Sequence, residues 1–319
     1  MVNPDSDLYR AHPDWVLAAP DRRRTLGRHQ MVLDYSKPEV VDNIYHQLYD
    51  VISKANISYI KWDMNRSITE CFSQGIEPEK QGMVYHKYIL GVYSLYERLI
   101  KDFPHILFES CASGGGRFDA GLLYYAPQAW TSDDTDGHER VKIQYGTSYG
   151  YPIASMGAHV SKSPNNQTGR IMHVDDRANI ACFGTFGYEL DLNDVDDEEF
   201  EAVKRQIVFM KEYRGLFQYG TLYRLQSPFE KNIASWMVVS DDKKKAVVVM
   251  YKTHKTPNIG METIKLQGLD ESMIYTINGN EKIYGDFLME RGLGTMGADE
   301  PWYLSDKDFT SRMFILEAE

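Results

Sequence analysis

Hydrophobic positions in the first two-thirds of the chain alternate between a helical spacing and short β-rich runs. Residues 38–54 place apolar side chains every three or four positions behind a proline in the first turn, which predicts an amphipathic helix, and residues 82–102 repeat that spacing. A further helix is expected from 196 to about 213, with acidic residues at its start that complement the helix dipole. Runs of β-branched and aromatic residues predict five strands: 58–63, 105–110, 128–133, 153–159 and 187–192.

Strands and helices that alternate in this way predict a parallel sheet, and repeated units of this size favour a (β/α) barrel. We count five strand–helix units after residue 55, whereas a closed TIM barrel has eight. The expected fold class is therefore α/β of the (β/α)8 TIM-barrel type, with about five of the eight units present, over residues 1–219.

The pattern changes after Gly220, where no long helical spacing remains. Turn sequences at 240–243 and 278–280 separate short apolar runs that predict strands at 235–239, 245–251, 262–266, 274–277 and 311–316. We therefore expect residues 220–319 to form a small antiparallel β-sandwich domain.

Composition narrows the classes of function. The chain has 35 Lys and Arg against 46 Asp and Glu, a net charge of −11, with 43% hydrophobic residues, which is typical of an ordinary folded protein. The negative charge argues against nucleic acid and anionic membrane surfaces as partners, and no apolar run approaches the about 20 residues of a membrane span. Without a signal-peptide pattern, and with only three cysteines and no CxxC pair, we expect free thiols in a reducing, cytoplasmic setting.

Polar clusters stand at the carboxyl ends of the predicted strands, where a (β/α) barrel builds its active site. Lys61 and Asp63 close the first strand, Glu109 the second and Asp133 the third. A helix cap or a loop salt bridge is the ordinary explanation for a single aspartate such as Asp63, and a buried Lys61–Asp63 ion pair is another. Charged residues at several consecutive strand ends make a catalytic interpretation stronger.

Paired carboxylates are what glycoside hydrolysis requires: one as nucleophile or base, and one that protonates the leaving oxygen. Neighbouring aromatics (Trp62, Trp130, Tyr124 and Tyr125) suit the apolar face of a sugar, although each taken singly is as readily core filling. The glycine-rich run at 111–117 lacks the lysine and hydroxyl of a P-loop, so close backbone approach to a ligand is the better interpretation.

These residues carry a resemblance to a known family. The chain resembles the family 36 glycoside hydrolases, the microbial α-galactosidases of melibiase type, in several long motifs that occur in the right order: LGR at 26–28, KWDMNR at 61–66, ESCASGGGRFD at 109–119, WTSDDTD at 130–136 and GTFGYEL at 184–190. The run CASGGGR departs from the family's usual pattern, which more often has an additional glycine after Cys-Ser.

The resemblance implies a retaining double displacement on terminal α-D-galactosyl residues of oligosaccharides such as melibiose and raffinose. Asp63 matches the family's nucleophile. The acid/base falls within residues 132–136; Asp133 is our choice, Asp134 the first alternative, and Asp136 is expected to cap the next helix. Retention requires the two carboxyl groups to lie about 5–5.5 Å apart.

Further residues match family positions that contact galactose: Arg28, Lys61, Asn65, Cys111 and Gly114, to which we add Trp130. The resemblance implies no metal or organic cofactor, an α-galactoside substrate as the partner, and homo-oligomers of the full-length form. An α-N-acetylgalactosaminidase or a transgalactosidase on the same barrel is an alternative, which the pocket at the sugar's 2-position decides.

A second alternative concerns the chain itself. Full-length members of the family carry a large N-terminal β-domain and the first barrel strands, which contribute an aromatic and acidic residues to the galactose site. Counting units, we expect this chain to correspond to the C-terminal portion of such an enzyme and to have weak or no activity by itself.

Overall fold

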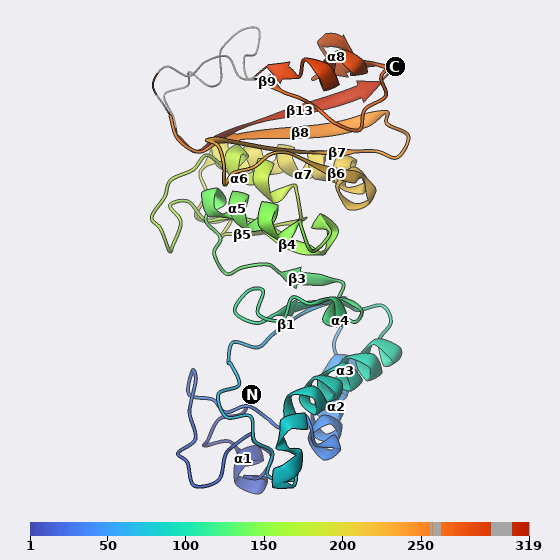
Figure 1. Ribbon diagram of the computed structural model, residues 1–319. Helices are drawn as coiled ribbons and strands as arrows, with labels where there is room; N and C mark the ends of the chain where they lie inside the picture. Colours follow the sequence, from blue (N-terminus) through green and yellow to red (C-terminus); the bar gives the residue numbers. More distant parts are fainter. Residues whose placement is uncertain (256, 258–262, 295–307, 319) are drawn as a thin grey trace. The chain divides into compact units, whose positions relative to one another are not determined.

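The computed structural model describes residues 1–255, 257, 263–294 and 308–318, which form two compact units, residues 1–130 and 131–319 (Figure 1). The first unit contains, in chain order, α1 (Asp7–Ala11), α2 (Pro38–Ser53), β1 (Tyr59–Asp63), the 3-10 helix η1 (Pro78–Met83), α3 (Val84–Asp102), β2 (Leu107–Cys111), α4 (Ala120–Leu123) and β3 (Gln128–Trp130). The two long predicted helices and the first three predicted strands are thus confirmed, with ends shifted by a few residues.

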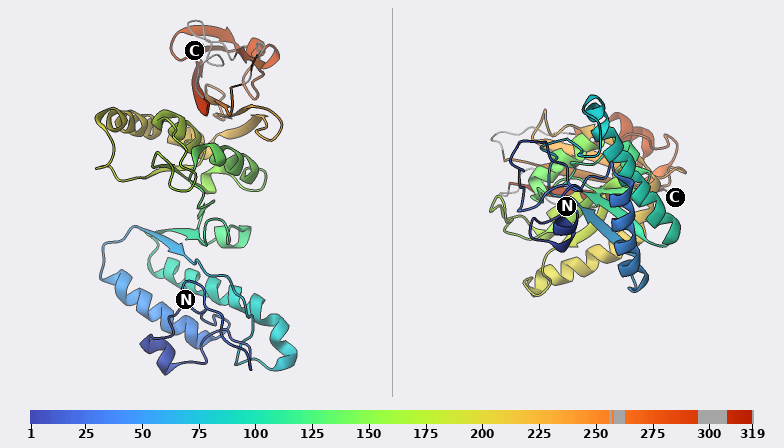
Figure 2. Two further views of the ribbon diagram at one scale, coloured as in Figure 1. Left: turned by 90° about the vertical axis from the view of Figure 1, so that its left-hand side faces the viewer. Right: turned by 90° about the horizontal axis from the view of Figure 1, so that it is seen from below.

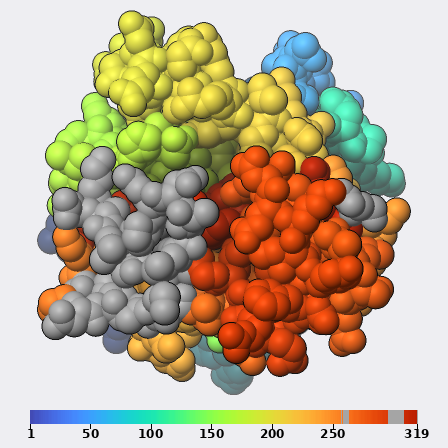
Figure 3. Space-filling model, turned by 90° about the horizontal axis from the view of Figure 1, so that it is seen from above, coloured from blue at the N-terminus to red at the C-terminus, as the bar shows by residue number. Residues whose placement is uncertain are grey.

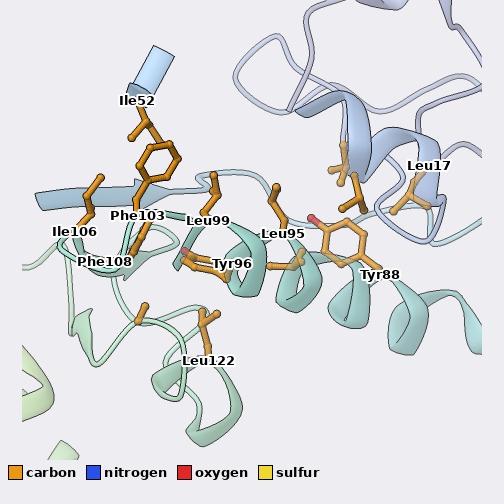
Figure 4. Packing of buried hydrophobic residues seen from close by; sticks show 14 of the residues in the cluster. Leu17, Ile52, Tyr88, Leu95, Tyr96, Leu99, Phe103, Ile106, Phe108 and Leu122 are labelled. Atoms are coloured by element: carbon orange, nitrogen blue, oxygen red, sulfur yellow. The ribbon is translucent and has the colours of Figure 1, made fainter. Parts of the chain in front are cut away.

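In the first unit, β1, β2 and β3 are parallel neighbours, and α2 and α3 lie side by side against them (Figure 2, left). One stripe of α3 supplies the core: Leu95, Tyr96 and Leu99 are fully buried and pack with Phe108 of β2 (Figure 4). Burial alternates along β1, because successive side chains of a strand point to opposite faces. That alternation leaves the charged residues of β1 on the face turned away from this core.

The second unit continues the strand–helix order. It contains α5 (Gly137–Thr147), the 3-10 helix η2 (Ile153–Ser155), β4 (Met156–Ser161), α6 (Val174–Ala181), β5 (Thr185–Glu189) and α7 (Asp197–Tyr219). Strands β4 and β5 are parallel, and each is followed by a helix. Within the described residues the five predicted strand–helix units are thus present, three strands in the first unit and two in the second. The strand expected at 153–159 begins later, because Pro152 and the 3-10 turn after it occupy its predicted start.

The C-terminal elements are β6 (Thr221–Gln226), β7 (Ile233–Val239), β8 (Lys245–Lys252), β9 (Thr263–Ile264), β10 (Ile274–Ile277), β11 (Glu281–Tyr284), α8 (Gly285–Glu290), β12 (Leu293–Gly294) and β13 (Thr310–Ala318). Six of these strands form an antiparallel sheet in the order β11-β10-β13-β8-β7-β6, and β12 pairs with β9. The predicted antiparallel region is confirmed; β6, β11 and β12 were not predicted, and Glu262 lies outside the described residues.

Both faces of the central strands β7 and β8 are buried. Met237 and Val248 face a core that includes Leu288 of α8. Helix α8 belongs to the orange to red block in Figure 3. The alternate residue Trp236 packs instead on the rings of Tyr145 and Phe183 from the strand–helix part of the same unit. The sheet is therefore a middle layer, which explains its near-continuous apolar sequence.

Candidate active site

The carboxyl ends of β1 and β2 bring together most of the predicted site residues. Strand pairing sets Lys61 beside Glu109 and Asp63 beside Cys111. Lys61 and Asp63 share the more exposed face of β1, whereas Trp62, on the other face, packs on Tyr96 with ring centroids 4.5 Å apart. Trp62 thus packs against the core, which agrees with the core-filling alternative.

The Asp63 carboxylate is oriented by two donors. The Asn65 side-chain amide donates to its Oδ2, and the Cys111 thiol donates to the same carboxylate. Asn65 is itself held, because its Oδ1 accepts the backbone N–H of Ser113 at 2.8 Å. Burial, reinforced by this contact with Asp63, raises the pKa of the Cys111 thiol to about 11, so the thiol keeps its proton and remains a donor at neutral pH.

The glycine-rich run forms the turn that makes these contacts possible. Ser113 and Gly114 both adopt the left-handed conformation, with φ of 50° and 82°, which glycine takes without steric cost. Ala112 donates its N–H to the Gly114 carbonyl at 2.9 Å, which closes the turn. The run therefore presents backbone to Asn65, and the close approach of this backbone to a ligand stays a prediction.

Lys61 lies between an acid and an aromatic ring. Its Nζ is 3.5 Å from Glu109 Oε1 and 4.2 Å from the centroid of Trp130, which is buried. The predicted alternative was an ion pair between Lys61 and Asp63, but the described contacts pair Lys61 with Glu109 instead. Glu109 is 1% exposed and also accepts hydrogen bonds from Tyr59 and Gln128. Among the contacts described above, the hydrogen-bond donors to the Asp63 carboxylate are therefore both neutral: the Asn65 amide and the Cys111 thiol.

Arg117 is a residue whose role the sequence did not reveal. Its guanidinium donates to the Cys111 carbonyl at 2.7 Å and to the Trp62 carbonyl at 3.3 Å, and so joins the ends of β1 and β2 next to Asp63. The sequence shows that Arg117 ends the glycine-rich run. That its guanidinium reaches back to β1 depends on the turn formed by this run.

Arg28 is placed apart from this cluster, in a turn from Gly27 to Gln30, and its side chain is exposed. The turn is nevertheless tied to the segment after β1. Arg66, the neighbour of Asn65 in the chain, donates to the Gln30 carbonyl at 3.1 Å and to the Thr25 carbonyl.

Asp133 and Asp134 belong to the second unit. The expectation that Asp133 ends a strand is wrong: β3 ends at Trp130, and residues 131–136 form a loop before α5. Asp133 has an exposed side chain, whereas Asp134 Oδ1 accepts the N–H of Asp136 at 3.0 Å within a local turn. A turn of this kind replaces strand pairing, which is why the strand stops early.

Asp136 caps the next helix, as predicted. Its Oδ1 accepts the N–H of His138 at 2.9 Å and lies 2.5 Å from Arg170, and its Oδ2 accepts from Thr168. Burial by itself would raise the pKa of Asp136, but the hydrogen bond from Thr168 and the Arg170 cation outweigh it and hold that pKa below its usual value. Arg170 thus contacts the loop that carries Asp133.

Two absences hold for the part of the chain that the structure describes. No group of three or more His, Cys, Asp or Glu side chains there is arranged to hold a metal ion. No helix there has the length and apolar character needed to cross a membrane. The three cysteines, Cys71, Cys111 and Cys182, are free thiols, as expected.

Comparison with known proteins identifies the family. The melibiase family model matches residues 1–220, and the model of the glycosyl hydrolase family 36 C-terminal domain matches residues 233–316. Alpha-galactosidase AgaA of Geobacillus stearothermophilus is 48% identical over 318 residues, and alpha-galactosidase 1 of Pediococcus pentosaceus is 44% identical over 319. Each alignment covers 100% of this chain and 43% of the relative, so the chain spans about two-fifths of the length of these relatives.

Solved structures agree. AgaA variants from G. stearothermophilus in complex with raffinose and with stachyose superpose with TM-scores of 0.95 and 0.94 at 46% identity, over 100% of this chain and 43% of theirs. Each variant carries an aspartate substitution, to asparagine in the raffinose complex and to alanine in the stachyose complex. On the motifs, the family models and the fold together, the chain belongs to the melibiases of glycoside hydrolase family 36.

Proposed function

We propose that this chain carries the nucleophile and the acid/base residue of a retaining α-galactosidase. The observation that carries the proposal is the setting of Asp63. Its carboxylate stands at the carboxyl end of a parallel strand, accepts from Asn65 and from a Cys111 thiol that stays protonated, and has the Lys61 ammonium on the same strand face. An oriented, strand-fixed carboxylate of this kind suits attack on an anomeric carbon.

Two observations support Asp133 over Asp134 as the acid/base. Asp134 uses a carboxylate oxygen inside its own turn, whereas the Asp133 side chain is exposed. In the numbering of AgaA, the two substituted aspartates of the raffinose and stachyose complexes are separated by the same number of positions as Asp63 and Asp133. Asp134 would be one position too far.

The chemistry then proceeds in two displacements. Asp63 attacks the anomeric carbon and forms a covalent galactosyl ester, while the C–O bond to the leaving sugar breaks and Asp133 gives its proton to that oxygen. In the second step the ionised Asp133 removes a proton from water, the water oxygen attacks the same carbon, and Asp63 is released. Two inversions at one carbon retain its configuration.

The proposed substrates are oligosaccharides with a terminal α-D-galactosyl residue, of the melibiose and raffinose type. The complexes of AgaA with raffinose and stachyose support this class. We propose that Lys61, Asn65, Cys111, Gly114, Trp130 and Arg28 line the galactose site. The free thiols support a reducing, cytoplasmic compartment. A homo-oligomeric full-length form and a boundary between the catalytic and C-terminal domains near residue 219 also remain proposals.

A labelling experiment tests the nucleophile directly. The chain is incubated with a fluorinated galactosyl fluoride that accumulates the glycosyl-enzyme, digested and examined by mass spectrometry. We expect one galactosyl adduct, on the peptide that contains Asp63, and none in Asp63→Ala. An adduct on another carboxylate would overturn the assignment.

Turnover is measured in parallel with nitrophenyl α-galactoside and nitrophenyl α-N-acetylgalactosaminide. Faster release from the second substrate would favour the α-N-acetylgalactosaminidase alternative. The same assay tests the expectation that this chain is weakly active by itself, since robust turnover that depends on Asp63 would contradict it.

A further inference from the structure

The loop between β3 and α5, residues 131–136, carries the proposed acid/base residue outside any strand. Within the loop, the Asp134 N–H donates to Ser132 Oγ and the Asp136 N–H donates to Asp134 Oδ1, both at 3.0 Å. These local turns shape the loop but do not anchor it to the rest of the unit. Its anchors come from other segments.

Residues 161–170, from the last residue of β4 into the segment before α6, supply anchors at the middle of the loop. Gln167 Nε2 donates to the backbone carbonyl of Asp133 itself at 3.1 Å. Ser161 Oγ donates to the Thr135 carbonyl at 2.7 Å, and Asn165 Nδ2 donates to Thr135 Oγ1 at 3.2 Å. Groups of Asp133 and Thr135 on the C-terminal side of the Asp133 side chain are thus held by side chains from one neighbouring segment. On its N-terminal side, the Ser132 carbonyl accepts a hydrogen bond from Arg140 of α5 at 3.3 Å.

The same segment anchors the end of the loop at Asp136, whose side chain is fully buried. Arg170 forms an ion pair with it at 2.5 Å, and Thr168 donates to its other oxygen. Arg170 is fixed in turn, because its guanidinium also lies 4.6 Å from the ring of Phe309, just before β13. A buried carboxylate with a cation, a hydroxyl and two helix N–H groups is a firm attachment point.

The anchoring segment is itself ordered by its own contacts. Asn165 Oδ1 accepts the N–H groups of Gln167 and Thr168 at 2.9 and 3.1 Å, and the Asn165 N–H donates to the Arg170 carbonyl at 2.9 Å. Asn165 is buried although it lies in a loop. The segment can therefore transmit the position of the β4 end to the Asp133 loop.

We propose that residues 161–170 form a clamp in which Gln167, Thr168 and Arg170 are positioning residues for the acid/base Asp133. The proposal rests on the proposed function and deepens it. Gln167 holds the Asp133 backbone, and Thr168 and Arg170 hold Asp136 three residues later, so the clamp fixes both ends of the segment from which the acid projects. The proposal includes no contact of Gln167, Thr168 or Arg170 with the substrate.

The proposal predicts a dependence on the leaving group. A raffinose-type substrate has a poor leaving oxygen that must receive a proton as its bond breaks, so a displaced acid slows the first step. A dinitrophenyl α-galactoside has a leaving group that departs without a proton, so the same displacement hardly affects that step. General loss of folded protein would lower both rates alike.

The test compares Arg170→Met, Arg170→Lys and Gln167→Ala with Arg224→Met. Arg224 is a matched control, since it also holds a loop, by donating to the Ser148 carbonyl at 3.0 Å and stacking 4.3 Å from the Tyr149 ring. For Arg170→Met we expect kcat on raffinose to fall roughly tenfold to hundredfold with KM little changed, while dinitrophenyl α-galactoside is hydrolysed almost as fast as before. Arg170→Lys should recover part of the loss, and Arg224→Met should show no such split.

Hydrogen exchange of the full 319-residue chain gives a readout that needs no turnover. Amides in peptides spanning 131–140 should exchange faster in Arg170→Met and Gln167→Ala, but not in Arg224→Met. Equal losses on both substrates, or exchange unchanged in both clamp variants, would overturn the clamp. If the unsubstituted chain hydrolyses neither substrate, as expected for a chain with no activity by itself, the exchange result alone decides the clamp. Gln167→Ala keeps the test valid should Arg170→Met not fold, because the Gln167 side chain is exposed.

Discussion

The two proposed catalytic carboxylates are held in different ways. Asp63 is the last residue of β1, and every residue of that strand has a partner on β2. Asp133 lies in a loop held by side chains, which include Gln167 and Arg170 of residues 161–170 and Arg140 of α5. Backbone pairing uses groups that every residue except proline provides, whereas a side-chain clamp requires particular residues. The loop should therefore be more sensitive to single substitutions outside the site than the strand.

The largest expected effect separates the chemical roles of the two carboxylates. Asp63→Ala should reduce turnover to background on every substrate, because no galactosyl-enzyme forms. Asp133→Asn should lower kcat by about 10²–10⁴-fold on raffinose but much less on dinitrophenyl α-galactoside, since only the first needs the proton. Steady-state kinetics on both substrates check this. If the activity of Asp63→Ala and of Asp133→Asn depended equally on the leaving group, the two carboxylates would not have the distinct roles proposed for them.

The second prediction concerns the contribution of Arg117 to the stability of the β1 and β2 ends. Arg117→Met removes the guanidinium that joins the Cys111 and Trp62 carbonyls. We expect the free energy of unfolding to fall by about 1.5–3 kcal/mol, because hydrogen bonds to a charged donor are lost, and we expect kcat to fall on both substrates alike. Urea unfolding and the two-substrate assay check this, with Arg98→Met, at a surface ion pair, as the control. A leaving-group split for Arg117→Met would contradict the comparison.

A third prediction concerns pH and the start of α5, which follows the clamped loop. Burial, with repulsion from Arg170 and Lys142, lowers the pKa of His138 to about 4, although Asp136 acts in the opposite direction. The unfolded chain therefore binds a proton that the folded chain does not between pH 6.5 and about 4, and stability falls as pH falls through that window, by about 1.4 kcal/mol per unit. His138→Gln should remove this slope, and His46→Gln, at an exposed position, should keep it. Urea midpoints at pH 7 and pH 5 measure it; equal slopes in both variants would contradict it.

The smallest expected effect returns to the strand region. At pH 8 a thiol of pKa about 11 is ionised to the order of one part in a thousand, so iodoacetamide should modify Cys111 slowly in the folded chain. Asp63→Asn removes the charged acceptor, favours the thiolate and should speed the reaction. Mass spectrometry of the peptide over time measures both rates. An unchanged rate in Asp63→Asn would argue against the Cys111–Asp63 hydrogen bond.

Much of the fold could be predicted because its signals are local. The amphipathic spacing of α2 and α3 and the apolar runs of the strands need only the neighbouring sequence. The extent of β3 could not be predicted, because residues 131–133 look like strand but are drawn into turns by Ser132 and Asp134. Strand β11, Glu281–Tyr284, was missed because its first two residues are charged and its two apolar residues, Ile283 and Tyr284, carry little hydrophobic signal.

The candidate site divides in the same way. Lys61 and Asp63 are candidates because parallel strands bring their carboxyl ends to one edge, whereas Asn65 and Cys111 were added by the family resemblance. The partners that orient these groups do not follow: Glu109 for Lys61, and Arg117 for the strand ends, depend on register and on a left-handed turn.

By itself, the sequence determined the order of strands and helices, the family and the set of candidate carboxylates, because each is encoded in residues close together in the chain. Only the tertiary structure decided how Asp133 is supported. Arg170 lies 34 positions from Asp136 and close to it only because the segment after β4 folds back over the loop after β3. Such a contact is set by packing between segments, which no local spacing of residues records.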